Sequence, residues 1–341
     1  MPNRAQQIYQ PAHRFGLGGV PLGNEFAKHS DDEAQATLEA AWAMGVRCYD
    51  VAPWYGFGLS ERRFGHFLHQ KPRDSYVLSS KVGKLFKASR GNRHAEIFPF
   101  SDSPNDLVID YTADGVKRSI EDSLQRLGVS HLDVVFVHDL SPDFAWFPNG
   151  WEAQYEIARK GAFPALSKLR DEGVIRAWGV GVNTPMAILK VIEDADPDVC
   201  LCARQYSLID HENALHEVCP AVRAKDVSLV IGSSLNAGFI SGSPRLNYGK
   251  TNFQIPPEAI AKRDQLRAVA ARHGVDLRTA AVQFSAAAPE AVALVVGARS
   301  ADQIREDWNA MQAKIPSAFW DELRHARLIE PDAPVPPPPE S

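Results

Sequence analysis

The chain has 341 residues, 45% of them hydrophobic and 23% charged, so it is long enough to bury one large core or two smaller ones. A formal net charge of -5 gives no electrostatic reason to expect a nucleic acid or an anionic membrane as partner. The sequence lacks both an apolar run of roughly 18 residues, which a membrane span needs, and an apolar signal core, so we expect a cytoplasmic protein.

Short apolar runs typical of β-strands alternate with segments of helical spacing along the chain. The strands are expected at 15–20, 46–50, 76–81, 133–138, 174–180, 199–203, 227–231 and 293–296. The helices are expected at 32–44, 60–69, 112–127, 162–172, 185–195, 213–224, 257–273, 276–287, 301–311 and 316–328. Residues 1–13 are expected to be a poorly ordered lead-in, and the segments 82–111 and 139–160 to be long loops.

This alternation predicts parallel strands joined by right-handed crossovers. Eight such units favour an α/β fold, a closed (β/α)8 TIM barrel with two accessory helices and long loops at its C-terminal face. An open doubly wound sheet is the alternative. We expect a single barrel domain over residues 1–330, followed by a disordered Pro-rich tail over 331–341.

The four cysteines are expected to be reduced thiols. Cys200 and Cys202 are too close in sequence for an ordinary disulfide or a standard zinc site. Free thiols agree with a cytoplasmic location. We expect no metal site, since the predicted strand ends carry no His-x-His pair or acidic cluster.

Ionisable groups stand at the ends of three consecutive predicted strands. Asp50 ends the second strand and has Tyr55 in its following loop, Lys81 ends the third strand, and His138 ends the fourth. Each has an ordinary structural explanation by itself, such as a rim salt bridge for Lys81 or a core position for His138. In a barrel, however, these strand ends meet at the face that carries the chemistry.

Together these groups suit proton exchange with an alcohol or carbonyl oxygen. The phenol of tyrosine has an unperturbed pKa of about 10, and a lysine cation beside it favours the phenolate. Asp50 is expected to pair with Lys81 and fix its position, while His138 hydrogen-bonds the substrate oxygen. The group contains no obvious nucleophile and supplies no electrons, so redox chemistry would need a bound hydride carrier.

The motifs around these residues resemble those of the aldo-keto reductases. The similarity lies in the Asp50–Tyr55 loop, Ser80-Lys81, Val137-His138-Asp139 and the stretch 172–181. It implies a tetrad of Asp50, Tyr55, Lys81 and His138. The segments 52–63, 122–128, 179–183 and 236–238 are similar to the aldose 1-dehydrogenase branch, which includes L-fucose, D-threo-aldose and L-galactose dehydrogenases and pyridoxal 4-dehydrogenases.

This resemblance implies an NAD(P)⁺-dependent oxidoreductase of carbohydrate metabolism. Its expected reaction is oxidation of an aldose of the L-fucose, D-arabinose or L-galactose type at C1 to the lactone, with Tyr55 as general acid/base and Trp54 packing on the sugar. The alternatives are oxidation of pyridoxal to 4-pyridoxolactone and general NADPH-dependent reduction of aldehydes or ketones. Outside this class, a non-catalytic binding subunit and a metal-dependent barrel hydrolase were weighed and are disfavoured by the tetrad and by the missing ligand pattern.

The resemblance also indicates the residues that would bind the cofactor. Asn183 falls one place after the family's usual Ser-Asn pair, and Gln205 stands two residues after the position of its usual Gln. An aromatic residue that stacks on nicotinamide is replaced by Gly232. The remaining candidates are Ser233 and Leu235 after the seventh strand and Gly297, Arg299, Gln303 and Asp307 after the eighth.

Few cations occupy the loop that would meet a 2′-phosphate. Gly297 and Gln303 stand where relatives often carry basic residues, and Arg299 remains. We therefore expect NAD to be favoured, with NADP as the alternative. The expected partner is a small sugar or aldehyde, bound by a monomer or homodimer.

Overall fold

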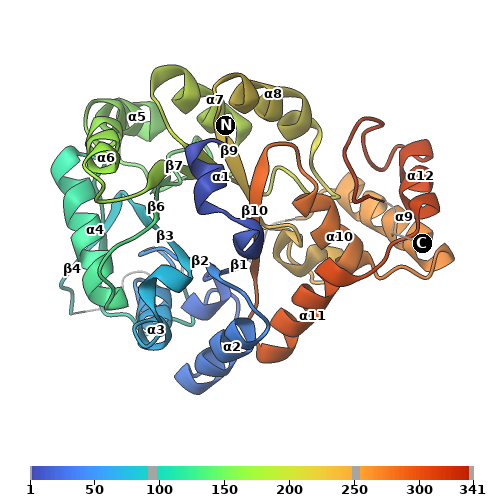
Figure 1. The fold of residues 1–341 in the computed structure, drawn as a ribbon, viewed down its shortest axis with the longest axis horizontal. Coiled ribbons are helices and arrows are strands. Elements are labelled where there is room, and N and C mark those ends of the chain that lie inside the picture. Colours follow the sequence, from blue (N-terminus) through green and yellow to red (C-terminus); the bar gives the residue numbers. More distant parts are fainter. Residues whose placement is uncertain (1, 91–97, 248–253, 338–341) are drawn as a thin grey trace.

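The computed structural model describes residues 2–90, 98–247 and 254–337 as a closed barrel of parallel strands (Figure 1). Around the barrel the order is β1-β10-β9-β8-β7-β6-β3-β2, which confirms the predicted TIM barrel. The strands are β1 (Phe15–Gly18), β2 (Cys48–Asp50), β3 (Val77–Val82), β6 (Val134–His138), β7 (Ala177–Val182), β8 (Val199–Ala203), β9 (Ser228–Gly232) and β10 (Ala291–Gly297).

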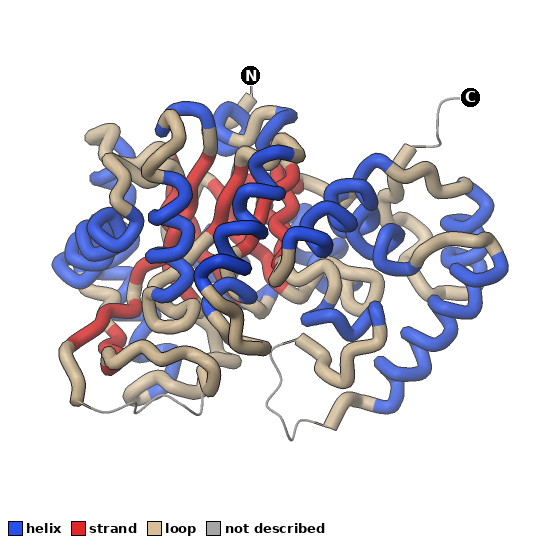
Figure 2. The backbone as a smooth tube through the Cα atoms, turned by 90° about the horizontal axis from the view of Figure 1, so that it is seen from below, coloured by secondary structure: helices blue, strands red, loops and turns tan. Residues whose placement is uncertain are grey.

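Helices surround the strands on the outside, as Figure 2 shows from below. They are α2 (Asp31–Ala43), α3 (Leu59–Leu68), α4 (Ala113–Leu127), α6 (Ala162–Asp171), α7 (Pro185–Asp194), the π-helix η4 (Ala214–Val218) with α8 (Cys219–Ala224), α10 (Leu277–Ala286) and α11 (Ala301–Gln312). The helices α9 (Pro257–Arg272) and α12 (Ser317–His325) lie beside each other at one end of the molecule. None of the described helices has both the length and the apolar character to cross a bilayer.

Local signals explain several helix starts. Ser30 caps α2 in a capping box with Glu33, and the Thr112 side chain accepts a hydrogen bond from Gly115 N to cap α4. Helix α3 begins at Leu59 after Gly58, one residue before the expected start, and the Ser60 hydroxyl donates to Gly19 O at 2.8 Å. That bond ties the start of α3 to the end of β1.

The N-terminal segment is not a loose lead-in, contrary to expectation. It forms α1 (Arg4–Ile8) and the turn η1 (Pro11–His13). Ala5, Ile8 and Tyr9 are buried in one apolar cluster with strand residues that include Val77 and Val134. These three side chains therefore close the barrel interior at the amino ends of the strands.

The segments expected to be loops contain regular structure. Strands β4 (Lys84–Lys87) and β5 (Asp106–Ile109) pair antiparallel within 82–111, and α5 (Gly150–Lys160) lies within 139–160. The described part of the Pro-rich segment also differs from a disordered tail. Ala333 is buried, and Arg324 Nη2 donates to its carbonyl at 2.9 Å. All four cysteines are free and buried, as predicted.

Candidate active site

Asp50 and Lys81 form a buried ion pair at the carboxyl edge of the barrel. In the parallel register Asp50 lies opposite Ser79, which places Lys81 two residues further along the same face of β3. Lys81 Nζ donates to Asp50 Oδ2 at 2.6 Å and to Val51 O at 3.0 Å. Ser79 Oγ donates to the other carboxylate oxygen at 2.7 Å, so both oxygens of Asp50 have a partner.

The loop after β2 brings Tyr55 against this pair. Lys81 Nζ lies 4.8 Å from the centre of the Tyr55 ring, within the range of a cation–π contact. Gly56 has a φ of +65°, and a Cβ there would lie 2.2 Å from Gly23 O. Only glycine fits this close approach, so the packing of Gly56 on Gly23 fixes the turn that carries Tyr55.

His138 completes the group from β6. Its ring centre lies 5.6 Å from that of Tyr55, with the two planes at 86°. Tyr111 Oη donates to His138 O at 2.6 Å and holds the end of the strand. Burial, and then the charges of Lys84 and Lys81, keep the pKa of His138 well below its ordinary value, so the imidazole is neutral near pH 7. Its buried Nδ1 has no hydrogen-bond partner among the described residues.

A second ion pair, which sequence reasoning missed, lies beside His138. Lys84 Nζ contacts Asp139 Oδ2, and the same oxygen lies 3.6 Å from His138 Nε2. The predicted substrate residue Trp54 is half-buried, and its ring centre is 4.2 Å from Lys84 Nζ. A sequence signal did exist: Lys84 follows a glycine directly after the strand end that carries Lys81, and Asp139 follows His138.

Glu25, in the connection after β1, lies near this second pair. Burial raises the pKa of Glu25 to about 8; the charge of Arg245 acts in the opposite direction, and that of Asp139 adds to the increase. Sequence reasoning did not single out Glu25, because it belongs to no motif.

The predicted cofactor residues lie in the loops after β7, β8 and β9, at the end of β10 and the loop that follows it, and in α11. Gln205 Nε2 donates to Asn183 O at 2.8 Å, so these two candidates are in contact. After β9, the backbone of Ser233, Asn236 and Ala237 is left-handed, a feature of backbone turns that present N–H groups to anions. Ser234 Oγ is buried and has no hydrogen-bond partner in the described part of the chain. Binding of a pyrophosphate by this loop, which also contains Leu235, stays a prediction.

The loop after β10 leads into the N-terminus of α11. Gly297 and Arg299 are exposed, and Arg299 N donates to Gln303 Oε1 at 3.0 Å. Asp307 is fully buried and paired with Arg278 at 2.8 Å. Burial raises the pKa of Asp307 to about 6 although Arg278 opposes this. Its carboxylate is thus engaged with α10, and contact with adenine stays a prediction.

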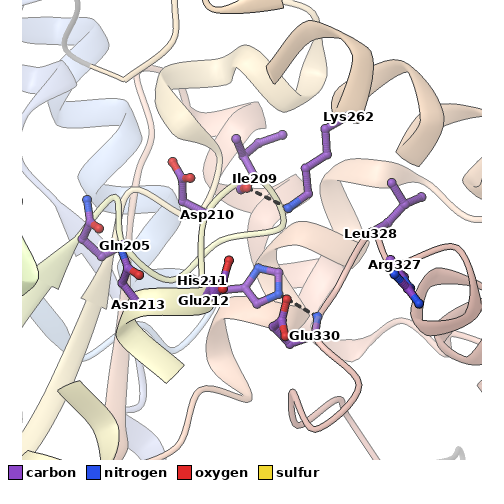
Figure 3. Close-up of a pocket in the computed structure, with 10 residues that line it drawn as sticks. All are labelled: Gln205, Ile209, Asp210, His211, Glu212, Asn213, Lys262, Arg327, Leu328 and Glu330. Atoms are coloured by element: carbon purple, nitrogen blue, oxygen red, sulfur yellow. Dashed lines mark hydrogen bonds between the residues drawn. The ribbon is translucent and has the colours of Figure 1, made fainter. Parts of the chain in front are cut away.

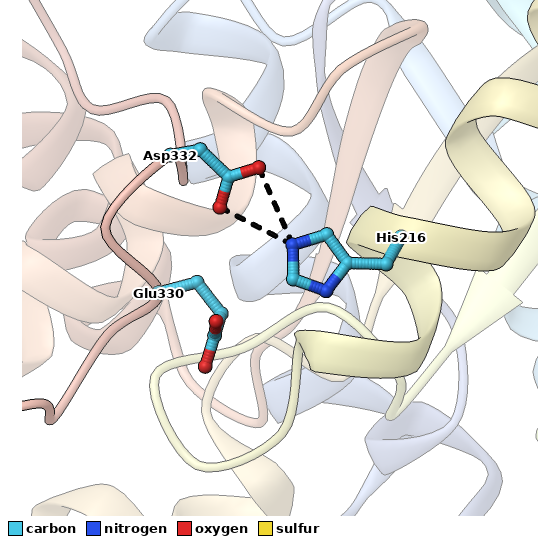
Figure 4. Close-up of side chains that lie close together, drawn as sticks. All are labelled: His216, Glu330 and Asp332. Carbon is cyan, nitrogen blue, oxygen red and sulfur yellow. Dashed lines mark hydrogen bonds and ion pairs between the residues drawn. The ribbon is translucent and has the colours of Figure 1, made fainter.

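Two further features lie where the loop after β8 meets the C-terminal segment. A cavity of about 150 Å³ is lined by Gln205, Lys262 and His211 among others, but by no member of the tetrad (Figure 3). His216, Glu330 and Asp332 place ligand atoms within 4.8 Å of one another (Figure 4). His216 Nε2 lies 3.2 Å from Asp332 Oδ1, and an ion pair accounts for that contact.

A closed parallel barrel with a buried Asp–Lys pair, a phenol and a neutral imidazole at its carboxyl edge is an arrangement suited to proton exchange with an oxygen. Residues 14–327 match the family model described as "Aldo/keto reductase family". The chain belongs to the aldo/keto reductase family and is an oxidoreductase.

Relatives and solved structures agree with this assignment. The chain is 36% identical to D-threo-aldose 1-dehydrogenase of Pseudomonas sp, and the match covers 92% of this chain and 94% of the relative. It is 35% identical to pyridoxal 4-dehydrogenase of Microbacterium luteolum, with the same coverage of each chain. An aldo-keto reductase of Bacillus halodurans in its holo form has the same fold, with a TM-score of 0.70, 21% identity and coverage of 93% of this chain and 92% of that one.

Proposed function

We propose that this chain oxidises an aldose at C1 to the lactone, with Tyr55 as general base and NAD⁺ favoured over NADP⁺. The observation that carries the proposal is the position of Tyr55 between the buried Lys81–Asp50 pair and the neutral His138. The 36% identity to D-threo-aldose 1-dehydrogenase and the 30% identity to L-galactose dehydrogenase of Arabidopsis thaliana support C1 of a sugar as the reacting centre.

The residues divide the proton chemistry between them. Lys81, oriented by Asp50 and Val51 O, puts a positive charge beside Tyr55 and favours the phenolate. Tyr55 takes the proton of the C1 hydroxyl, and neutral His138 holds the same oxygen by a hydrogen bond. The nicotinamide cofactor, when bound, supplies the acceptor for the hydride that leaves C1.

The loop after β9 would hold the pyrophosphate, and the start of α11 the adenosine end. The charges around α11 support the preference for NAD⁺. Arg305 is paired with Asp302 at 2.9 Å, and Arg278 with Asp307 and Glu306, so these cations are already engaged by carboxylates. Arg299 remains, and the nearby acidic groups oppose a 2′-phosphate.

Oxidation of pyridoxal is a second candidate, which the aromatic wall of the site favours. The Trp54 ring lies 5.5 Å from Phe98 and 5.6 Å from Phe144, and such a wall suits a flat ring as well as the apolar face of a sugar. The 35% identity to pyridoxal 4-dehydrogenase supports the same alternative.

A substrate screen tests the proposal. L-fucose, D-arabinose, L-galactose and pyridoxal are each incubated with the protein and NAD⁺, the absorbance of the reduced cofactor is followed, and the product is analysed. We expect reduction of NAD⁺ with at least one aldose and a lactone as product. Turnover of pyridoxal alone would replace the leading proposal with the second, and turnover of neither would contradict both.

A further inference from the structure

A second buried ion pair lies at the site and has no part in the proton transfer proposed above. Lys84 Nζ contacts Asp139 Oδ2, and the Lys84 side chain is 1% exposed whereas that of Asp139 is 14% exposed. The ammonium is therefore sealed inside the protein, while the carboxylate is partly exposed.

The backbone holds both partners in place. Gly83 has a φ of +98°, and a Cβ there would lie 2.0 Å from the Tyr111 ring, so the turn that leads to Lys84 requires glycine. Asp139 is left-handed, with a φ of +48°, and its N–H donates to Gly181 O at 2.9 Å. Non-glycine residues in this region cluster at functional sites, because the surrounding structure must maintain the strained conformation.

The surroundings of the pair place it between the tetrad and the aromatic wall. Asp139 Oδ2 lies 3.6 Å from His138 Nε2. On the other side, Lys84 Nζ lies 4.2 Å from the ring centre of Trp54 and 4.1 Å from that of Phe144. Burial lowers the pKa of Lys84, and the charges of Asp139 and Asp143 oppose this whereas that of Lys81 adds to it.

We propose that Asp139 accepts a hydrogen bond from a substrate hydroxyl on the carbon next to the reacting one, and that Lys84 is the buried counter-ion that holds the Asp139 carboxylate in position. This inference rests on the proposed function. In the proposed reaction His138 holds the oxygen on C1. The Asp139 carboxylate oxygen lies 3.6 Å from His138 Nε2, which places it within reach of the hydroxyl on C2. The site would then select α-hydroxy aldehydes in their hemiacetal form.

In this arrangement the hydroxyl on C2 has a large effect on kcat/KM. A substrate without it would displace water from the partly exposed Asp139 carboxylate and leave that hydrogen bond unreplaced, and sites built to hydrogen-bond a hydroxyl reject analogues that lack it. Loss of a hydrogen bond to a charged group is expected to lower kcat/KM by a factor of roughly 10 to 100.

The test compares an aldose that the wild type oxidises with its 2-deoxy analogue. We expect the wild type to prefer the aldose by roughly 10- to 100-fold in kcat/KM, and Asp139→Asn to reduce that ratio to within about threefold. The double variant Lys84→Met with Asp139→Asn removes both charges but keeps at position 139 a residue that tolerates the left-handed backbone, so it should fold while showing the same loss of preference. An unchanged ratio in either folded variant would overturn the proposal.

Lys84 is a positioning residue, and the substrate ratio separates this role from a structural one. Lys84→Met should lower both Tm and the substrate ratio, because the Asp139 carboxylate loses its counter-ion. A fall in Tm with the wild-type ratio in Lys84→Met would show that the pair only stabilises the fold. If the wild type oxidises no aldose, the proposed function itself fails. If it oxidises the aldose and its 2-deoxy analogue equally well, only this inference fails.

Discussion

The Lys81 ammonium lies 2.6 Å from the Asp50 carboxylate, with 1% of the lysine side chain and 5% of the aspartate side chain exposed to solvent. Loss of one partner leaves the other charge buried without compensation, which is far more destabilising than loss of an exposed pair. The same contact holds the Lys81 ammonium 4.8 Å from the centre of the Tyr55 ring, so we expect its loss to affect stability and activity together.

Asp50→Asn is predicted to lower stability and activity together. The expected loss is about 3 to 5 kcal/mol in the free energy of unfolding, since a buried pair is broken. We expect kcat to fall by roughly two orders of magnitude, because Lys81 is no longer held beside Tyr55. Urea unfolding and steady-state kinetics measure the two effects. Removal of the exposed Arg159–Glu156 pair is the control and should leave the free energy of unfolding and kcat close to wild type. An equally mild effect of Asp50→Asn would contradict the account.

The N-terminal helix is predicted to be part of the barrel core. Ile8 is 2% exposed and packs in the apolar cluster at the amino ends of the strands. Ile8→Ala should cost about 2 to 4 kcal/mol in the free energy of unfolding, whereas the exposed Gln7→Ala should change it little. Unfolding curves in urea give both values. Equal stabilities of the two variants would show that α1 contributes no packing.

His211 is predicted to make stability depend on pH. Its Nε2 accepts from Glu330 N at 3.0 Å (Figure 3). Its Nδ1 donates to Ser207 O, also at 3.0 Å, and the two bonds together require the neutral ring. Burial, followed by the charge of Lys262, lowers the pKa of His211 to about 4. The unfolded chain binds the proton below a pKa of about 6.5, so the stabilisation is complete above that pH and is lost as the pH falls towards 4.

The pH effect should reach roughly 3 kcal/mol over that window for this one group. His211→Gln should flatten the dependence of the free energy of unfolding on pH between 6.5 and 4. The exposed His66→Gln serves as control and should keep the wild-type slope. If His211→Gln unfolds with the wild-type pH dependence, the neutral ring is not what holds the C-terminal segment.

The cofactor preference is predicted to favour NAD⁺. The ratio of kcat/KM for NAD⁺ to that for NADP⁺, measured with one aldose, should exceed one. Arg299→Ala should reduce kcat/KM for NADP⁺ more than for NAD⁺, because a cation near the ribose interacts with a 2′-phosphate. A hundredfold preference of the wild type for NADP⁺ would refute the assignment.

The features predicted correctly from the sequence are those that depend on hydrophobic periodicity and on the residues at strand ends. Alternating elements led to the barrel, and the parallel register then brought Asp50, Lys81 and His138 to one edge. The sequence did not reveal α1 or the β4–β5 hairpin, because short elements outside the alternation are set by tertiary contacts such as those of Ile8 and Tyr9. The Lys84–Asp139 pair was missed for a related reason, since one turn and one left-handed residue create it.

Replacement of Tyr55 tests the central claim most directly. The measurement combines kcat for an aldose with NAD⁺ and the Kd of the cofactor, obtained by calorimetry, for the wild type and Tyr55→Phe. Loss of the phenol should lower kcat by about two to four orders of magnitude and leave the Kd within about threefold. Tyr155→Phe, which removes a hydroxyl bonded to Asp194 at 2.9 Å, is the matched control and should retain kcat. A Tyr55→Phe enzyme that turns over at the wild-type rate would contradict the assignment of Tyr55 as the base.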